Sequence, residues 1–300
     1  PIPSFGAFPN SPFFNAGDLK NTGFELVANY RNHVGKLNYL VGANVSTYKT
    51  KVTHLNSEYL TGAVSRTYEG GPIGRFYGYK QIGIFQNKAE IDAYVDKNGN
   101  KIQPNAHPGD FKFAKLGESG PLNDDEDRTF IGNPNPDIVY GFNLGFEYKG
   151  FDFTASFQGT LGNDIYNVSK GTLAVVGYQN ALADAYTKAW RQEGDHAVYP
   201  RITTSNDNNN YRTSSFMVED GSYLRLQNLQ IGYTLPSSLM AKLQRIKSAR
   251  FYVSAQNLFT VTGYSGLDPD LGANSPLDMG YDDTRYPSSR TVMFGVNLQF

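Results

Sequence analysis

Hydrophobic and polar residues alternate along several stretches of this 300-residue chain. Every second residue from Tyr140 to Tyr148 is apolar or aromatic, and the alternation restarts at Phe151 after Lys149-Gly150. Because successive side chains of a β-strand point to opposite faces, this pattern predicts two strands joined by a tight hairpin. We expect the aromatic side chains of both strands to share one face.

The same alternation predicts seven strands, at 24–31, 37–50, 139–148, 151–160, 222–235, 250–261 and 290–300. None of them has a charged residue on its apolar face. The phase of the fifth strand changes near Gln227-Asn228, and a one-residue β-bulge at that point would keep its apolar side chains on one side. The predicted fold class is therefore all-β, although alternation alone also fits a soluble β-sandwich.

The lengths of the connections favour a membrane barrel over a sandwich. Short turns join the predicted strands on one side, and one of them, 236–248, has a helix-like sequence. The long connections 51–138, 161–221 and 262–289 are irregular and rich in Asn, Gly and Pro. Short periplasmic turns and long extracellular loops are typical of outer-membrane barrels, whereas a sandwich spaces its turns more evenly.

The strand directions agree with a barrel. If Phe300 ends in the periplasm, every short turn is periplasmic and every long connection is extracellular. The strand-like segment 77–86 would break this parity if it crossed the membrane, so we assign it to an extracellular ribbon in the first long connection. Seven strands cannot close a transmembrane barrel, whose smallest members have about eight, and an open sheet would leave unpaired backbone groups in lipid. We therefore expect 1–300 to be the C-terminal part of a larger antiparallel transmembrane barrel.

Composition excludes several other classes of protein. Lys plus Arg number 27 against 28 for Asp plus Glu, and this balance argues against a nucleic-acid surface, which needs a basic excess. No apolar run approaches the roughly 18 residues of a spanning helix. Cysteine is absent, which excludes disulfides, thiolate metal sites and cysteine nucleophiles, and the four histidines lack zinc-site spacing. We expect no cofactor and no enzymatic activity.

Six segments, together with the closing strand, resemble the C-terminal half of SusC/RagA-like TonB-dependent transporters. They are 17–30 (GDLKNTGFELVANY), 70–85 (GGPIGRFYGYKQIGIF), 127–159 (DRTFIGNPNPDIVYGFNLGFEYKGFDFTASFQG), 226–236 (LQNLQIGYTLP), 249–260 (ARFYVSAQNLFT) and 264–270 (YSGLDPD). The resemblance covers nearly the whole chain in colinear order. It implies a barrel of about 22 strands with an N-terminal plug. These 300 residues would supply its last seven strands, and the plug and the earlier strands would lie outside this sequence.

The resemblance also implies a location, partners and an activity. The protein would lie in outer-membrane lipid, with a SusD-like lipoprotein over its mouth and the TonB complex acting through the plug. Its activity would be energy-coupled import of a nutrient too large for porins, either a glycan or an oligopeptide. Two alternatives stay open: a passive porin-like channel, and a soluble β-rich glycan-binding or adhesion module.

Candidate ligand-binding residues lie in the long connections. Tyr178, Tyr186 and Trp190 could stack on a sugar ring, and the last two lie in a short amphipathic segment, 181–191, that predicts a helix. Packing within the loop's own small core is about twice as frequent an explanation for such residues. Further candidates from the loops are Arg191, Tyr264 and Tyr281.

Two other features suggest specific roles. Phe300, which closes an alternating strand, resembles the signal that the outer-membrane assembly machinery recognises, and it also fits a purely interfacial aromatic residue. The acidic run 123–127 suggests calcium because hard cations bind clustered carboxylates, with Asp124 and Asp127 as weak candidates. In the resembling family a ligand-rich stretch precedes this position, but here 116–122 has lost most of those residues, so a solvated surface loop is favoured.

Overall fold

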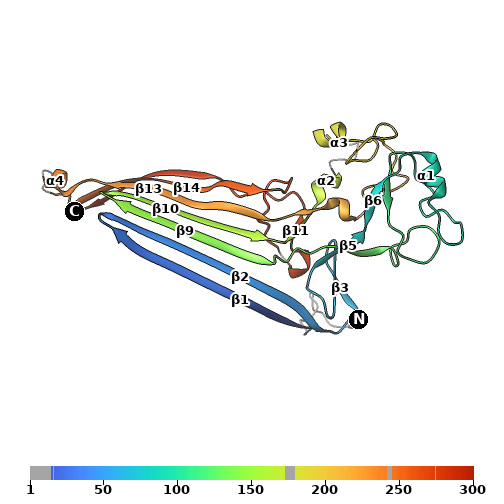
Figure 1. The fold of residues 1–300 in the computed structure, drawn as a ribbon, viewed down its shortest axis with the longest axis horizontal. Helices are drawn as coiled ribbons and strands as arrows, with labels where there is room; N and C mark the ends of the chain where they lie inside the picture. Colours follow the sequence, from blue (N-terminus) through green and yellow to red (C-terminus); the bar gives the residue numbers. More distant parts are fainter. Residues whose placement is uncertain (1–14, 16, 173–179, 242–244, 274) are drawn as a thin grey trace, which may run out of the picture.

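The computed structural model describes residues 15, 17–172, 180–241, 245–273 and 275–300. Seven long strands form one antiparallel sheet in the order β1-β2-β9-β10-β13-β14-β16. Their bounds are β1 Gly17–Val34, β2 Leu37–Leu55, β9 Ile138–Tyr148, β10 Phe151–Leu161, β13 Tyr223–Thr234, β14 Ser248–Thr262 and β16 Thr291–Gln299. All seven predicted strands are therefore confirmed, and each pairs with its neighbours in the sequence-ordered series (Figure 1).

The first two strands are longer than predicted. β1 and β2 contain 18 and 19 residues, and their hairpin pairs from Val34–Leu37 to Gly17–Leu55, with one register shift between Asp18 and Leu19. The added residues are largely polar and lack alternation; Asn21 and Thr50, for example, face each other across the ladder and form a side-chain hydrogen bond of 2.6 Å. Alternation marks only the part of a strand that has one apolar face, so it missed the polar extension of the hairpin.

The register confirms that one face of the sheet is apolar. Ile231 of β13 lies between Phe153 of β10 and Val253 of β14, and Val253 in turn faces Phe294 of β16. Outward apolar side chains of this face are widely exposed: Phe24, Leu26, Tyr30, Val41, Phe146, Phe151, Ile231, Phe251, Val253, Phe259, Val261, Val292, Phe294, Val296 and Leu298. An apolar surface this extensive is too large for a protein in water and suits contact with lipid.

The opposite face of the sheet is polar. Asn143, Ser156, Asn228 and Gln256 form one row across four adjacent strands. The predicted bulge is confirmed at Gln227, because the register shifts between Leu226 and Asn228 against β14 and between Ser156 and Phe157 against β10. The bulge keeps the apolar side chains on one face across the whole sheet.

All long connections lie at one end of the sheet, and the C-terminus and the short helix α4 (Ser237–Met240) lie at the other (Figure 1). The predicted ribbon 77–86 is confirmed to lie outside the large sheet, where it contributes to two small ones. These comprise β3 Tyr59–Thr61, β4 Ser65–Tyr68, β5 Arg75–Tyr79 and β8 Arg128–Gly132 in one sheet, and β6 Gln81–Ile84 with β7 Phe111–Phe113 in the other. A third small sheet contains β12 Val218–Asp220, β11 Asp164–Asn167 and β15 Tyr281–Asp282.

Three short helices complete the connections: α1 Lys88–Ala93, α2 Val168–Thr172 and α3 Ala183–Thr187. Two further turns of 3₁₀ helix cover Ser215–Met217 and Pro276–Asp278. The predicted helix 181–191 is thus reduced to the five residues of α3. In the described part of the chain, no helix is both long enough and apolar enough to cross a membrane.

A substitution on the apolar face tests the assignment of the two faces. We expect Val253→Arg to lower the free energy of unfolding by about 2–4 kcal/mol, because it places a charge among lipid-facing side chains. The thermal unfolding of the full-length protein in phospholipid would report this loss. Ser254→Arg places the same charge on the opposite, polar face of the strand and should change stability much less. An equal loss of stability in both variants would contradict the assignment of the two faces.

Candidate functional site

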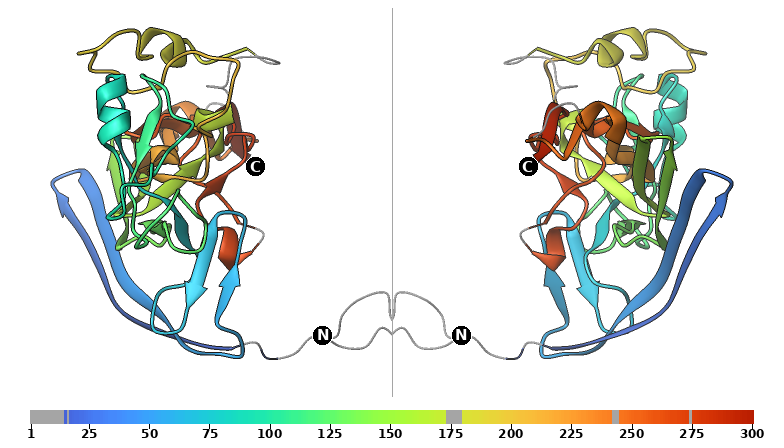
Figure 2. Two further views of the ribbon diagram at one scale, coloured as in Figure 1. Left: turned by 90° about the vertical axis from the view of Figure 1, so that its right-hand side faces the viewer. Right: turned by 90° about the vertical axis from the view of Figure 1, so that its left-hand side faces the viewer.

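The three long connections fold together into a cap at one end of the sheet. We name them loop 1 (56–137), loop 2 (162–222) and loop 3 (263–290). The left view of Figure 2 looks at the molecule from this end and shows segments of all three loops close together. Loops 1 and 2 share one hydrophobic core, against which Tyr281 of loop 3 packs. The core contains Phe76, Tyr79, Phe111, Phe113, Tyr166, Ala185, Ala189, Tyr199, Phe216 and Met217. Because this core draws on loops 1 and 2 together, neither loop buries its aromatic residues alone.

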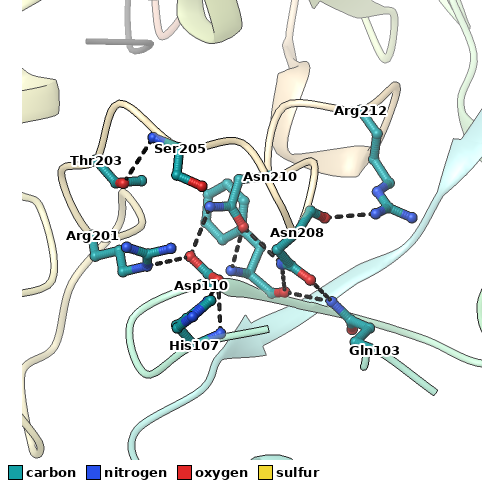
Figure 3. Close-up of polar contacts among 10 residues, drawn as sticks. Gln103, His107, Asp110, Arg201, Thr203, Ser205, Asn208, Asn210 and Arg212 are labelled. Carbon is teal, nitrogen blue, oxygen red and sulfur yellow. Dashed lines mark hydrogen bonds and ion pairs between the residues drawn. The ribbon is translucent and has the colours of Figure 1, made fainter. Parts of the chain in front are cut away.

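A buried carboxylate joins loop 2 to loop 1 (Figure 3). Asp110 of loop 1 is fully buried and accepts hydrogen bonds from Arg201 Nε at 2.7 Å and from Asn210 Nδ2 at 3.0 Å. It also accepts the backbone N–H of His107 at 2.8 Å. A buried charge is tolerated when it is paired and hydrogen-bonded, and Asp110 meets both conditions.

Side-chain amides continue this network along β7. Gln103 and Asn208 both donate to the carbonyl of Phe111, at 2.9 and 3.0 Å, and Asn210 Oδ1 accepts the Phe111 backbone N–H at 2.9 Å. Gln103 Oε1 accepts the N–H of Phe113 at 2.8 Å. These amides satisfy the edge of β7 that faces away from β6, so the polar network takes the place of a neighbouring strand.

Loop 3 is held by a second buried ion pair. Arg225 of β13 is 3 % exposed, and its guanidinium pairs with Asp268 and with Asp270, the latter at 3.2 Å. Asp268 also accepts the backbone N–H of Ser288 at 2.9 Å. Because Arg225 lies on the polar face of the large sheet, this pair fixes loop 3 against the inner side of the wall.

Contacts between loops 2 and 3 close the cap. Ser265 of loop 3 donates to Glu219 of loop 2 through both its N–H and its hydroxyl at 2.9 Å. The preceding Tyr264 donates its hydroxyl to Asp282 within loop 3 at 2.6 Å. Tyr166 of β11 pairs with Tyr281 of β15 in a parallel bridge, and their rings stack at 6.1 Å. The sequence shows no alternation for such short pairings, so they were not predicted.

The acidic run of loop 1 binds donors within the protein. Asp127 is fully buried and accepts the backbone N–H groups of Leu116, Gly117 and Asn123 at 2.8–2.9 Å, and Lys115 Nζ at 2.8 Å. Burial alone would raise the pKa of Asp127, but the Lys115 ammonium and the three N–H donors outweigh it and lower the pKa.

Asp124, three residues earlier, binds two side chains instead. It accepts the Tyr79 hydroxyl at 2.5 Å and pairs with Arg128 at 2.5 Å. Burial, with the adjacent Asp124 carboxylate, raises the pKa of Tyr79 to about 12. Within the described residues, no three His, Asp or Glu side chains gather in a metal-binding arrangement. Calcium at Asp124 or Asp127 would have to displace these donors.

The structure does not bring the predicted ligand residues into one site. Tyr186 is 61 % exposed, and the Arg191 guanidinium lies 4.8 Å from its ring centroid. Trp190 packs against Gly109, whose φ of +88° and lack of a side chain leave room for the indole, and donates to Gln86 at 3.2 Å. Tyr178 lies outside the described residues.

Two further candidates have structural contacts. Tyr264 is buried and Tyr281 is half-buried, both between loops 2 and 3. Of the described candidates, only Tyr186 and Arg191 present their side chains to solvent. Phe300 is 71 % exposed at the far end of the sheet, where its carbonyl accepts Lys247 Nζ at 2.9 Å. Its role in assembly stays a prediction.

The structure also brings together a set of aromatic and cationic residues that was not predicted from the sequence. Tyr59, Arg66, Tyr68, Arg75, Tyr77 and Phe130 share one face of the sheet β3-β4-β5-β8, and we call this set the arginine–aromatic face. The signal was present in the sequence as an arginine followed two residues later by an aromatic residue, in Arg66-x-Tyr68, Arg75-x-Tyr77 and Arg128-x-Phe130. It was overlooked because each strand is too short for a recognisable alternation.

Comparison with known proteins agrees with this architecture. No protein-family model matches the chain. The chain is 33 % identical over its whole length to TonB-dependent receptor P3 of Formosa agariphila, of which it spans 30 %. It is homologous to a C-terminal part of the SusC-type TonB-dependent receptors. TonB-dependent receptor SusC of Bacteroides thetaiotaomicron is 25 % identical over 95 % of the chain, which spans 27 % of it.

A solved structure shows the same fold. The RagAB peptide transporter superposes on 95 % of the chain with a TM-score of 0.74 at 24 % identity, and the chain covers 29 % of that structure's chain. The predicted fold class, an antiparallel outer-membrane barrel, is therefore confirmed. The chain spans about 30 % of the length of the relatives it matches.

The buried carboxylate of the cap can be tested directly. We expect Asp110→Asn to weaken the attachment of loop 2 by about 2 kcal/mol, because it removes a charged acceptor from Arg201 and Asn210. Limited proteolysis of the full-length receptor would then cut loop 2 faster. Asp207→Asn changes an exposed carboxylate of the same segment and should leave the rate unchanged; equal rates in both variants would show that the network does not hold the loop.

The lowered pKa of Asp127 predicts a local pH dependence. A carboxylate whose folded pKa is depressed stabilises the fold above its unfolded pKa of about 3.9, and this stability is lost as the pH falls through the folded value. Hydrogen exchange of segment 116–127, corrected for intrinsic rates, should therefore accelerate on acidification below roughly pH 4. Asp127→Asn should already exchange fast at neutral pH, whereas Asp125→Asn, at an exposed carboxylate, should behave as the wild type.

Proposed function

We propose that the protein containing this chain imports a large nutrient across the outer membrane by a TonB-dependent mechanism. The chain would supply the last strands of the barrel wall and part of the extracellular mouth. The single observation that supports this most strongly is the combination of a lipid-facing sheet with three loops folded into one cap at one end.

The sheet requires further strands to function in lipid. In the described part of the chain, β1 and β16 each pair on one side only, so each has one free edge. Because lipid offers no partner for backbone N–H and C=O groups, we infer that strands outside these 300 residues pair with both edges and close the barrel. The polar face would then line the interior and contact a plug.

The cap suits binding of a solute at the extracellular surface before transport. Its loops are held by buried ion pairs and a common core rather than left as separate flexible loops. We propose that this rigid surface meets the substrate and a SusD-like lipoprotein. RagAB is described as a peptide transporter, and for this chain both a glycan and an oligopeptide are consistent with the loops.

Uptake in intact cells tests the mechanism. We expect deletion of the gene to stop the removal of one nutrient class from the medium, with a casein digest and a set of soluble polysaccharides as the probes. Deletion of tonB should have the same effect, because the energy would come from the inner-membrane proton gradient. Uptake that persists without TonB would favour the passive channel and overturn this proposal.

The partner and the membrane location need a separate measurement. We expect the detergent-extracted protein to co-purify with a lipoprotein and to have a mass several times that of these 300 residues. Recovery of the protein in the aqueous phase without detergent would favour the soluble binding module instead.

A further inference from the structure

The arginine–aromatic face contains two arginines directly opposite each other. Arg66 of β4 and Arg75 of β5 are register partners in an antiparallel pair, so their side chains leave the same face of the sheet side by side. Like charges directly opposite in a sheet are destabilising. Among the described residues, neither arginine forms an ion pair with a carboxylate.

Aromatic rings hold both guanidiniums in place. The Arg66 guanidinium lies 4.5 Å from the ring centroid of Tyr59 and 4.4 Å from that of Tyr77, and the Arg75 guanidinium lies 3.9 Å from that of Phe130. Such cation–π contacts stabilise a guanidinium but do not neutralise its charge. Arg66 Nη1 donates to the Tyr68 hydroxyl at 3.4 Å. The planar guanidinium has further N–H groups at its edge, which is the geometry for binding a carboxylate.

The rings themselves form one continuous layer. Tyr68 contacts Tyr59, Tyr77 and Phe130 at centroid distances of 5.5, 6.4 and 5.9 Å, and Tyr77 contacts Phe130 at 5.6 Å. All these side chains are half-buried, so the layer is rigid but still reaches solvent. Burial lowers the pKa of Arg75.

A third arginine, next to the arginine–aromatic face, already has an ion-pair partner. Arg128 of β8 belongs to the same arginine-x-aromatic pattern, and its guanidinium pairs with Asp124. The protein therefore neutralises one of the three arginines with its own carboxylate and leaves Arg66 and Arg75 for an external one.

We propose that Arg66 and Arg75 bind carboxylates of an acidic glycan at the mouth of the transporter. Charge complementarity requires an anionic ligand at two adjacent guanidiniums that lack an internal partner. The rest of the face is made of the rings of Tyr59, Tyr68, Tyr77 and Phe130, and the three tyrosines carry hydroxyl groups. Tyrosine hydroxyls can hydrogen-bond sugar hydroxyls and the ring edges can contact sugar C–H groups.

A peptide ligand fits this face less well. One common way for an extended peptide to bind is to add a strand at a sheet edge, with pockets for alternate side chains. The arginine–aromatic face is the broad side of the sheet β3-β4-β5-β8 rather than its edge. This inference rests on the proposed import function, because it names the substrate class that the cap would recognise.

Binding to the purified full-length transporter, with its co-purifying partners, tests the inference. The probes are uronic-acid oligomers (oligogalacturonate, oligomannuronate and oligoglucuronate), and the matched neutral probe is methyl-esterified oligogalacturonate. We expect at least one acidic oligomer to bind in isothermal titration calorimetry with marked salt dependence. The double variant Arg66→Gln/Arg75→Gln should weaken this binding by about 100-fold, and the methyl ester should bind weakly to both proteins.

Two control variants separate this role from general effects. Lys88→Gln/Lys101→Gln removes two positive charges that pair with Asp92 elsewhere in loop 1 and should leave binding unchanged. Arg66→Lys keeps the charge but loses the planar, bidentate geometry, so it should weaken binding about tenfold. Unchanged thermal unfolding of each variant would confirm that the cap is intact.

Several outcomes would overturn the inference. Binding of the acidic oligomers that does not depend on Arg66 and Arg75, equal binding of the methyl ester, or tighter arginine-dependent binding of oligoglutamate would each contradict an acidic-glycan site. If no uronic-acid oligomer binds while TonB-dependent uptake of another nutrient is observed, this inference is wrong and the proposed import function stands. Loss of TonB dependence would instead contradict the proposed function itself.

Discussion

The need to pair every backbone group in lipid determines most of this structure. Each of the five inner strands of the large sheet pairs on both sides, and even the bulge at Gln227 interrupts the ladder by a single residue. The constraint also explains why the connections differ in length. Periplasmic turns need only reverse the chain, whereas on the other side the backbone leaves the lipid and can form irregular structure that pairs within itself.

In the cap, which lies outside the lipid, side chains hydrogen-bond backbone groups at strand edges. Its strands are short, so side chains satisfy edges that would otherwise be free. Gln103, Asn208 and Asn210 complete the edge of β7, and Asp110 binds the loop 2 residues that approach it. Together with the shared aromatic core, these contacts join loops 1 and 2, and the pairing of Tyr166 with Tyr281 adds loop 3. A body of this kind can present a fixed surface to a ligand, which separate flexible loops could do only at an entropic cost.

Charge is distributed differently in the two parts of the molecule. On the inner face of the wall, Arg225 and Arg250 both pair with aspartates, and Asp110 and Asp127 in the cap are saturated by donors. By contrast, Arg66 and Arg75 lie directly opposite each other in the sheet, and among the described residues neither forms an ion pair with a carboxylate. They lie on the surface of the cap that is richest in aromatic contacts, which is why we assign ligand recognition to that face rather than to the aromatic residues of loop 2.

The wall was predictable from the sequence, and the cap was not. Alternation identified all seven strands, their antiparallel order and the bulge, because a sheet with one apolar face repeats the same two-residue pattern along its whole length. Trp190 and Tyr264, by contrast, were selected by residue type alone. Only the tertiary structure shows that Trp190 binds Gln86 of loop 1 and that Tyr264 is buried against Asp282 within loop 3. The partners of Asp110 are about 90 to 100 residues away in the chain. No local pattern encodes such contacts, so the cap, its ion pairs and the pairing of Arg66 with Arg75 were decided by the folded chain.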